Sequence, residues 1–411
     1  MDQGRNWRAS WANLASRHYD FRKKISAAGR PDGFAMVPMH PESVYLESHV
    51  NKEQSILPSR LLADIDRFSG TDVVIFGDVM LDEYIFGSVD RISPEAPVPI
   101  VRIEKEEFRL GGAGNVAKNI TSLGGSAKLF GTIGQDNAAG RMRDMLLEHG
   151  IEDHCFQELD RLTIRKTRII AQQQQIVRID RESDCLPTTS AQETLLAGVE
   201  NALKTSGVLI VSDYGKGIVS LPVMNRLRHI CRSLPHQPRI IIDPKPKNFP
   251  AYTDVALLTP NTKEAGIESL DCGPLEAMKN EEKHRDVLES GQRLMHALHC
   301  QELLVTLGAR GMMLFRSASE AVHIPTAARK VYDVTGAGDT VIAVMGLAIA
   351  SGLDTLTGCL LANYAAGIVV GQIGATAVTP DQLRKTVSSW PVANWSVLPL
   401  PEQFQDHAGV I

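Results

Sequence analysis

The sequence predicts an α/β fold in which a mostly parallel central sheet carries helices on both faces. Three observations support this prediction. From about Pro58 onward, short runs rich in β-branched residues alternate with amphipathic segments, which is the rhythm of β-α-β units. Most of the short runs end in a polar or glycine-containing motif, where parallel sheets bind their ligands. The chain has 411 residues and a hydrophobic content of 43%, which suits one large domain with a substantial core.

The expected strands are short and apolar, whereas the expected helices are longer and repeat their apolar residues every three or four positions. Val73-Val-Ile-Phe76 shows the first pattern, and Val341–Ala350 is apolar throughout and predicts a buried helix. In chain order we expect strands at 73–76, 127–130, 208–211, 239–242, 256–259 and 303–306, and helices at 115–123, 140–148, 193–204, 285–298 and 341–350.

Two regions contain β-like runs with no helix between them. Pro97–Ile103 lies in the first region, and Lys166–Ala171 and Ile176–Asp180 flank a turn in the second. They predict a small sheet, or lid, that projects from the main domain and uses segments of about 82–110 and 163–182. An edge extension of the main sheet is the alternative. A projecting sheet exposes an apolar face, which closure over a substrate or pairing in a homodimer would cover.

Composition argues against several classes of function. The net charge is −5 and there is no basic stripe, so we expect no nucleic-acid partner. The sequence lacks a run of 18 uncharged apolar residues, and its six cysteines are widely spaced. These features predict a cytoplasmic protein with no membrane partner, no zinc site and no disulfide framework. We expect residues 1–57 to be a poorly ordered extension, 58–395 a single domain and 396–411 a C-terminal tail.

The run Asp333-Val-Thr-Gly-Ala-Gly-Asp-Thr340 carries the strongest chemical signal. Gly336, Ala337 and Gly338 begin the apolar helix and leave its first backbone N–H groups open to a phosphate or a developing anion. Asp339 follows in the first turn, where a carboxylate can take the proton of a hydroxyl that attacks a phosphoryl group. The alternative is an ordinary glycine-rich helix start with a favourable acidic residue.

A second glycine-rich run, Gly111-Gly-Ala-Gly-Asn115, precedes another expected helix. Together the two runs resemble the signature regions of the ribokinase-like (pfkB) carbohydrate kinases, and the resemblance extends from about Asp72 to Pro380. Five finer matches resemble the heptose-7-phosphate kinase branch of that family, namely Gly77–Asp82, Arg91–Pro99, Ser212–Gly217, Leu258–Asn261 and Asp333–Ala343. In many bacteria that kinase is fused to an adenylyltransferase with an H-x-G-H motif. This sequence has no such motif, so it resembles the kinase-only form.

The resemblance implies ATP and Mg²⁺ as cofactors, with K⁺ as a further expected ion. It assigns Asp339 as the base and the three preceding amides as an anion hole. Asn261 and Glu264 would position Mg²⁺ and phosphate. Other residues expected on the nucleotide side are Lys245, Thr306, Gly308, Gly311 and Asn363, of which Asn363 could equally be a satisfied core residue. Asp333 and Thr335, with carbonyls near 371–374, are where relatives hold a monovalent cation.

On the sugar side, the resemblance implies hydroxyl-binding roles for Asp78, Gly111, Gly112 and Asn115. A substrate that already carries a 7-phosphate also needs cations. We expect Lys166 and Arg178 to make this contact, among the basic residues Arg91, Arg109, Lys166, Arg168 and Arg178. The alternative for each of these residues is a solvated charge on a strand face. The implied reaction is ATP-dependent phosphorylation of D-glycero-D-manno-heptose 7-phosphate at its anomeric C1 hydroxyl. The product is heptose 1,7-bisphosphate, on the route to ADP-heptose for lipopolysaccharide. The alternatives are another pfkB sugar or sugar-phosphate kinase and a non-catalytic nucleotide-binding relative.

Overall fold

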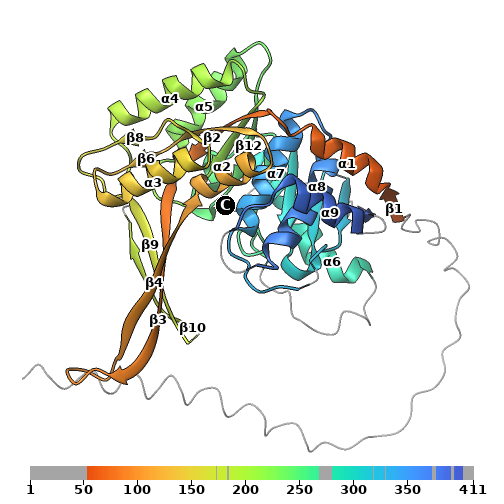
Figure 1. The fold of residues 1–411 in the computed structure, drawn as a ribbon. Helices are drawn as coiled ribbons and strands as arrows, with labels where there is room; N and C mark the ends of the chain where they lie inside the picture. The colour runs from red at the N-terminus through yellow and green to blue at the C-terminus, as the bar shows by residue number, and fades with distance from the viewer. Residues whose placement is uncertain are drawn as a thin grey trace, which may run out of the picture. The chain divides into compact units, whose positions relative to one another are not determined.

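A long central sheet organises the computed structural model (Figure 1). The structure describes residues 53–172, 174–182, 185–267, 280–317, 319–328, 330–372, 376–389 and 393–400. Within these ranges the strand order is β1-β17-β16-β15-β14-β13-β12-β11-β2-β5-β7. The strands are β1 (Glu53–Ile56), β2 (Asp72–Gly77), β5 (Ser126–Phe130), β7 (Glu152–Asp153), β11 (Val208–Ser212), β12 (Arg239–Asp243), β13 (Leu257–Leu258), β14 (Glu302–Thr306), β15 (Met312–Phe315), β16 (Glu320–Ile324) and β17 (Ala393–Pro399).

The sheet is parallel from β7 to β14 and antiparallel from β14 to β1. The predicted α/β class is confirmed, and each of the six predicted strands is present. Pairing of Glu53 with Ser396 places β1 and β17 in the sheet, so the predicted domain limits at 58 and 395 were wrong. Strand β1 is a four-residue edge strand, and such a strand need not contain the continuous apolar run by which a strand is recognised in the sequence. The remainder of the predicted extension and tail lies outside the described residues.

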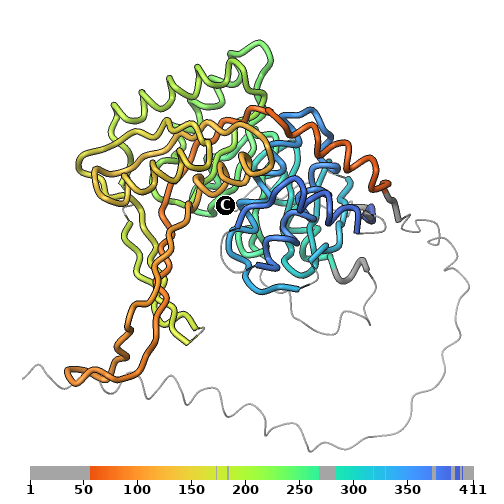
Figure 2. The backbone as a smooth tube through the Cα atoms, viewed as in Figure 1, coloured from red at the N-terminus to blue at the C-terminus, as the bar shows by residue number. Residues whose placement is uncertain are grey.

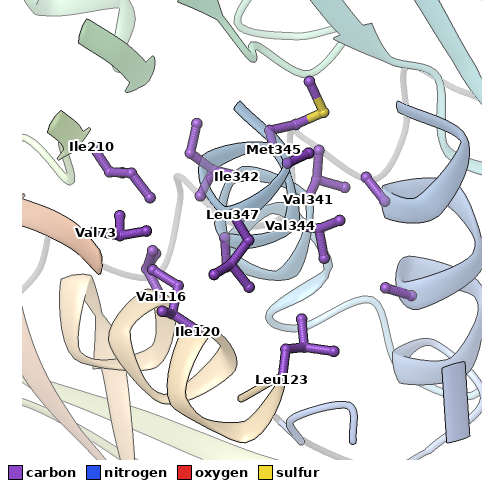
Figure 3. Packing of buried hydrophobic residues seen from close by; sticks show 14 of the residues in the cluster. Val73, Val116, Ile120, Leu123, Ile210, Val341, Ile342, Val344, Met345 and Leu347 are labelled. Carbon is purple, nitrogen blue, oxygen red and sulfur yellow. The ribbon is translucent and has the colours of Figure 1, made fainter. Parts of the chain in front are cut away.

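Helices cover both faces of the sheet, as predicted. Helices α1, α2, α3, α7, α8 and α9 share one apolar cluster with the sheet, and α4, α5 and α6 share the other. Figure 3 shows Ile342 and Leu347 of α7 packed near Val116 and Ile120 of α2. The helices are α1 (Pro58–Asp66), α2 (Ala113–Ser122), α3 (Asn137–Glu148), α4 (Thr189–Leu203), α5 (Leu221–Ser233), α6 (Asn280–Leu298), α7 (Ala337–Ala350), α8 (Thr355–Val369) and α9 (Pro380–Ser389), with 3₁₀ turns η1 (Pro246–Ala251) and η3 (Gly308–Arg310).

The lid is a separate four-stranded sheet with the order β10-β9-β3-β4. It consists of β3 (Val79–Ile92), β4 (Pro99–Gly112), β9 (Ile164–Ala171) and β10 (Gln174–Arg181), while β6 (Thr132–Ile133) pairs with β8 (Phe156–Gln157) elsewhere. The alternative of an edge extension is therefore wrong. Figures 1 and 2 show the β3–β4 hairpin extending away from the central sheet. Strand β3 was only partly anticipated, because its sequence mixes apolar and charged residues without a helical or strict strand period.

The lid is connected to the central domain at the carboxyl ends of the parallel strands. Strand β2 ends at Gly77 and β3 begins at Val79, while β4 ends at Gly112 and α2 begins at Ala113. Lid strands therefore start and finish beside the carboxyl ends of the parallel strands, where ligands bind in α/β sheets. None of the helices in the described part of the chain is long and apolar enough to span a membrane.

Candidate active site

The motif residues gather around a pocket of about 140 Å³ at the carboxyl ends of the parallel strands. Its lining consists of Tyr214, Asp243, Lys245, Thr259, Asn261, Glu264, Thr306, Gly336, Gly338 and Asp339. A larger pocket of about 320 Å³, which includes Arg228, Arg239 and Asp254, contains none of the predicted site residues. We assign the smaller pocket as the active-site candidate because it collects polar and charged groups from five separate strand and helix ends.

Helix α7 opens into this pocket through a glycine turn. Gly336, the residue before the helix, has φ of 80°, a left-handed conformation that favours glycine. The next amide, of Ala337, donates to the carbonyl of Val334 at 3.3 Å, so it is partly engaged in the turn. Helical geometry leaves the following N–H groups, beginning with Gly338, without an acceptor inside the helix. The predicted anion hole therefore depends mainly on the amides beyond Ala337.

Asp339 is almost fully buried, and both of its carboxylate oxygens accept hydrogen bonds. The Asn115 side-chain amide donates to Oδ2 at 2.7 Å, and the Tyr214 hydroxyl donates to Oδ1 at 2.6 Å. Burial raises the pKa of Asp339 to about 6, although these two bonds oppose the shift; the nearby Asp82 carboxylate adds to it. The group is thus mostly ionised at neutral pH and close enough to titration to exchange a proton, as a general base requires.

The first glycine-rich run forms the junction between β4 and α2. Gly112 has φ of +57°, and a Cβ there would collide with the Asp78 carbonyl; a Cβ on Gly111 would lie 2.7 Å from Oδ2 of Asp82. The junction therefore needs glycine for both conformation and space. It also brings Asn115 beside Asp339. The Asn115 side chain is 1% exposed, and its Oδ1 has no hydrogen-bond partner among the described residues. A buried, unpaired acceptor of this kind can receive a hydroxyl from a ligand.

Asp78 and Asp82 make different contacts, although only Asp78 was predicted to bind substrate hydroxyls. The Asp78 carboxylate accepts the backbone N–H of Tyr214 at 2.8 Å and of Lys216 at 3.0 Å, and burial raises its pKa to about 6. These bonds anchor the loop after β11. Asp82 instead lies against Gly111 and forms an ion pair with Arg168 at 2.6 Å. Its buried carboxylate is a second candidate for binding substrate hydroxyls.

One face of the lid carries a cluster of basic side chains, interleaved with the carboxylates of Asp82, Glu107 and Asp180. Arg109 pairs with Glu107 at 3.0 Å. Strand register places Arg109 and Lys166 on either side of Asp82, and Arg168 beside Tyr84; residues directly opposite each other share a face. The guanidinium groups of Arg109 and Arg168 lie 4.8 Å and 5.1 Å from the centre of the Tyr84 ring. The Tyr84 hydroxyl is buried without a partner in the described part of the chain. We call Arg109, Lys166 and Arg168, with Tyr84, the cationic lid face.

Lys166 and Arg178, the two residues predicted to bind the substrate phosphate, lie in different environments. Lys166 lies in the site, with its ammonium nitrogen 5.5 Å from the centre of the Tyr214 ring, and burial lowers its pKa. Arg178 is 51% exposed and makes two bonds to Asp180, at 2.8 Å and 2.9 Å. Arg168 is also paired, but its side chain is only 15% exposed, so Arg178 differs from it in its exposure to solvent. Arg91, on the distal part of β3, is exposed.

On the nucleotide side, Asn261 and Glu264 bond reciprocally. The backbone N–H of Asn261 donates to Glu264 Oε2 at 3.0 Å, and the N–H of Glu264 donates to Asn261 Oδ1 at 3.0 Å, as in a capping box. The other Glu264 oxygen pairs with Lys245. Thr306 lies alongside Asn261 through an isolated parallel bridge. The predicted N-x-x-E element thus faces the pocket while it also holds its own turn together.

Asp243, at the end of β12, lines the same pocket as Glu264 and Asp339, and we call these three residues the acidic wall. Burial raises the pKa of Asp243 well above the usual range, and the carboxylates of Asp339 and Glu264 add to this effect while Lys245 opposes it. Among the charged groups that act on Asp243, Lys245 favours its ionised form. A divalent cation in this pocket would favour the ionised form further.

The glycines after β14 form a tight turn beside the pocket. Gly308 and Gly311 have φ of +59° and +91°, and a Cβ on Gly311 would collide with the Ile324 carbonyl. Asn363 of α8 donates to the Pro325 carbonyl at 2.7 Å and accepts from the Ala327 amide at 3.3 Å. These contacts are those of a satisfied core residue, the alternative that the sequence left open.

The segments predicted to hold a monovalent cation lie side by side. The Tyr332 amide donates to the Val370 carbonyl at 2.7 Å. Asp333 Oδ1 accepts the backbone N–H and the hydroxyl of Thr335, at 2.9 Å and 2.7 Å. Of the predicted carbonyls near 371–374, residues 373 and 374 lie outside the described residues.

Sequence reasoning did not single out Tyr214, Asp82 or Asp243. Tyr214 and Asp82 belong to motifs that it had noted, Ser212–Gly217 and Gly77–Asp82, and Asp243 directly follows the strand expected at 239–242. The available signal was the position of each residue, one or more places after a β-branched run, where parallel strands present ligand-binding groups.

Comparison with known proteins agrees with this geometry. Residues 70–382 match the pfkB family of carbohydrate kinases. The bifunctional protein HldE of Nitrosococcus oceani is 41% identical over 324 residues, covering 79% of this chain and 65% of that protein. The chain therefore spans about 65% of that relative's length. Ribokinase from Arabidopsis thaliana, solved with ribose and ATP, superposes with a TM-score of 0.58 at 18% identity, over 77% of this chain and 99% of that one. Phosphofructokinase-2 from Escherichia coli, solved with potassium, gives 0.61 at 20% identity, over 78% and 98%.

Proposed function

Because the chain belongs to the pfkB family of carbohydrate kinases and is an ATP-dependent sugar kinase, we propose that it phosphorylates D-glycero-D-manno-heptose 7-phosphate at the C1 hydroxyl. The product would be heptose 1,7-bisphosphate, an intermediate of ADP-heptose synthesis. The observation that carries the proposal is the cationic lid face beside the base. Two guanidinium groups and one ammonium group at this place suit a sugar that already bears a phosphate.

The proton and the phosphoryl group follow separate paths in this proposal. Asp339 accepts the proton of the C1 hydroxyl as its oxygen attacks the γ-phosphorus of ATP and ADP leaves. The backbone N–H groups at the start of α7 face the transferring group and stabilise its negative charge. Asn115 Oδ1 and the Asp82 carboxylate are placed to accept sugar hydroxyls on the lid side of the base.

The acidic wall fits the Mg²⁺ that family membership implies. Asp243 and Glu264 lie in one pocket with Asp339. Burial together with the carboxylates of Asp339 and Glu264 raises the pKa of Asp243, which a cation bound there would lower. Asp243 and Glu264 would hold the ion, directly or through water. When bound, Mg²⁺ supplies charge neutralisation on the ATP phosphates. The loops at 332–335 and 370–372 fit a structural role for K⁺, supported by their close approach.

A second copy of the chain is proposed as the partner of the lid. The face opposite the cationic one carries exposed apolar side chains; on β10, Val177 is 44% and Ile179 is 53% exposed. Ile103 and Val98, in the β3–β4 hairpin region, are also more than half exposed. An exposed apolar sheet face with open edge strands is unfavourable in water. A homodimer through the lids would cover it.

A substrate panel tests the reaction. The protein is incubated with ATP, Mg²⁺ and one sugar at a time, and ADP release is followed. The panel contains D-glycero-D-manno-heptose 7-phosphate, the unphosphorylated heptose, ribose, fructose and fructose 6-phosphate. We expect kcat/KM for the heptose 7-phosphate to exceed every other value by at least about tenfold, corresponding to one charge-assisted contact. A preference for ribose or fructose would refute the heptose assignment and point to another pfkB kinase.

A further inference from the structure

We propose that Tyr214 is a positioning residue for the base: its hydroxyl holds the Asp339 carboxylate in the orientation and charge state in which it accepts the substrate proton. The proposal deepens the kinase function above and rests on Asp339 being its base. Nothing in the sequence motifs of Asp339 points to this partner, since the two residues are 125 positions apart in the chain.

The two donors to Asp339 define the plane of its carboxylate. Asn115 donates to Oδ2 and Tyr214 donates to Oδ1, from α2 and from the loop after β11. A carboxylate held at both oxygens cannot rotate freely about its Cβ–Cγ bond. Each oxygen keeps a further lone pair, so the substrate hydroxyl can still approach. The reacting lone pair is thereby aimed before the sugar binds, which is the kind of preorganisation that shortens the path to the transition state.

Tyr214 is itself held firmly. Its backbone N–H donates to Asp78 Oδ2 at 2.8 Å. The following amide, of Gly215, donates to Asp213 Oδ1 at 2.5 Å, and Asp213 is fully buried. The second oxygen of Asp213 accepts from Asn248 at 2.6 Å and from the Tyr252 hydroxyl. These hydrogen bonds hold the loop after β11 in place, and the loop in turn fixes the position of the Tyr214 ring.

The ring lies between the two halves of the site. The Lys166 ammonium, from the lid, is 5.5 Å from its centre, and the Lys245 ammonium, from the nucleotide side, is 5.4 Å away. Burial and the nearby Asp339 raise the pKa of Tyr214 well above its usual range. The phenol therefore stays a hydrogen-bond donor throughout the pH range in which Asp339 titrates.

The charge around Asp339 makes this donor important. Burial and the Asp82 carboxylate on β3 oppose ionisation of the base, whereas Lys245 and the bonds from Asn115 and Tyr214 favour it. Asp243 on β12 also faces this pocket, but its own raised pKa keeps it protonated where Asp339 titrates. Removing the Tyr214 bond leaves burial and Asp82 less opposed. The base should then keep its proton to a higher pH.

The test is Tyr214→Phe, which removes the hydroxyl and keeps the ring. A hydrogen bond to a charged group is worth about one to two pKa units. We therefore expect the acid limb of kcat/KM to move from about pH 6 upward by about one to two units. The charge state alone should lower the rate at pH 7 by about two- to tenfold, and the deficit should shrink near pH 9. The KM for ATP should not change.

Three comparisons distinguish a role of Tyr214 in positioning Asp339 from a general effect on folding. Thr355→Val removes a hydroxyl–carboxylate bond remote from the site, to Glu302, and should lower thermal stability without moving the acid limb. In an Asp339→Asn background, Tyr214→Phe should reduce the residual rate by less than about threefold, because the two residues act as one unit. NMR of ¹³C-labelled aspartate, with the Asp339 signal identified by its loss in Asp339→Asn, should show the same upward pKa shift without any turnover.

An unchanged acid limb, an unchanged Asp339 titration or full additivity of the two substitutions would each overturn the proposal. Failure of the proposed function looks different. In that case the wild-type protein would phosphorylate none of the sugar phosphates, while the aspartate titration would still decide whether Tyr214 controls Asp339.

Discussion

Replacing Asp339 with asparagine is expected to remove most turnover and, at the same time, to stabilise the fold. Burial raises the pKa of Asp339 from 3.8 to about 6, so the folded protein prefers the protonated group. The stability that this group contributes is full below pH 3.8 and is lost as the pH rises through 6. At neutral pH the ionised carboxylate therefore costs stability that the neutral asparagine does not cost.

The size of the effect follows from the shift. About two pKa units at 1.36 kcal/mol each give an upper limit of about 3 kcal/mol at pH 8, and roughly half of that at pH 5. Asparagine also fits the site. Its oxygen can accept from Asn115, and its amide can donate to the Tyr214 oxygen, since a hydroxyl is both donor and acceptor. The gain should therefore not be cancelled by an unpaired buried group.

Urea unfolding at pH 5 and pH 8 measures the stability, and steady-state kinetics measure the activity. We expect the asparagine variant to be stabilised more at pH 8 than at pH 5, by roughly 1 kcal/mol. Its kcat should fall by roughly two to four decades, with ATP affinity retained. Asp354→Asn is the matched control. Asp354 caps α8 through Thr357 and has a lowered pKa, so this variant should lose stability at pH 8.

Either of two results would refute the reasoning about Asp339. Equal effects of Asp339→Asn on stability at both pH values would mean that its carboxylate is not held with a raised pKa. Activity within a few-fold of wild type would mean that Asp339 is not the base.

Three further predictions concern the lid and the chain start. Lys166→Ala and Arg168→Ala should each raise the KM for the sugar phosphate by about one to two decades and leave the KM for ATP unchanged. Arg178 is paired with Asp180 on the exposed part of the strand, so Arg178→Ala should change the KM for the sugar phosphate less than about threefold. Equal effects from all three substitutions would disprove phosphate recognition by the cationic lid face. Ile179→Glu places a charge on the exposed apolar face and should shift sedimentation from dimer to monomer, whereas an unchanged sedimentation coefficient would remove the lid from the dimer interface. Deleting residues 1–50 leaves β1 intact, so turnover and Tm should hardly change; a large loss of either would assign those residues a role in the kinase.

The sequence could predict the parts of the site that depend on local chain geometry. Gly336 and the apolar helix behind it are read from adjacent residues, because a left-handed turn and a helix start are local events. The parallel strands were predicted for the same reason. Each one is a short β-branched run followed by a polar motif, and the structure places those motifs at one edge of the sheet.

What the sequence could not predict depends on pairing across long distances. Asn115 and Asp339 are 224 positions apart, and only the packing of α2 against α7 brings them within 2.7 Å. Asp78 is predicted to bind the substrate because a carboxylate after a strand suits that role; its bonds with the Tyr214 and Lys216 amides, 136 and 138 positions away in the chain, could not be predicted. For Arg178 the sequence leaves a contact with the substrate phosphate and a solvated strand-face charge open, and the structure shows an exposed ion pair with Asp180 two residues away.

The distribution of charge explains why the lid must belong to the site. Both proposed substrates are anionic, and each would raise the pKa of a base that already has two carboxylates near it. Lys245 opposes this on the nucleotide side, where Glu264 holds it in place. The lid supplies the corresponding cations on the sugar side, Lys166 and Arg168, of which Arg168 is fixed by Asp82. A lid without these cations would allow a neutral sugar to bind, but Asp339 would face a phosphorylated sugar with its charge uncompensated.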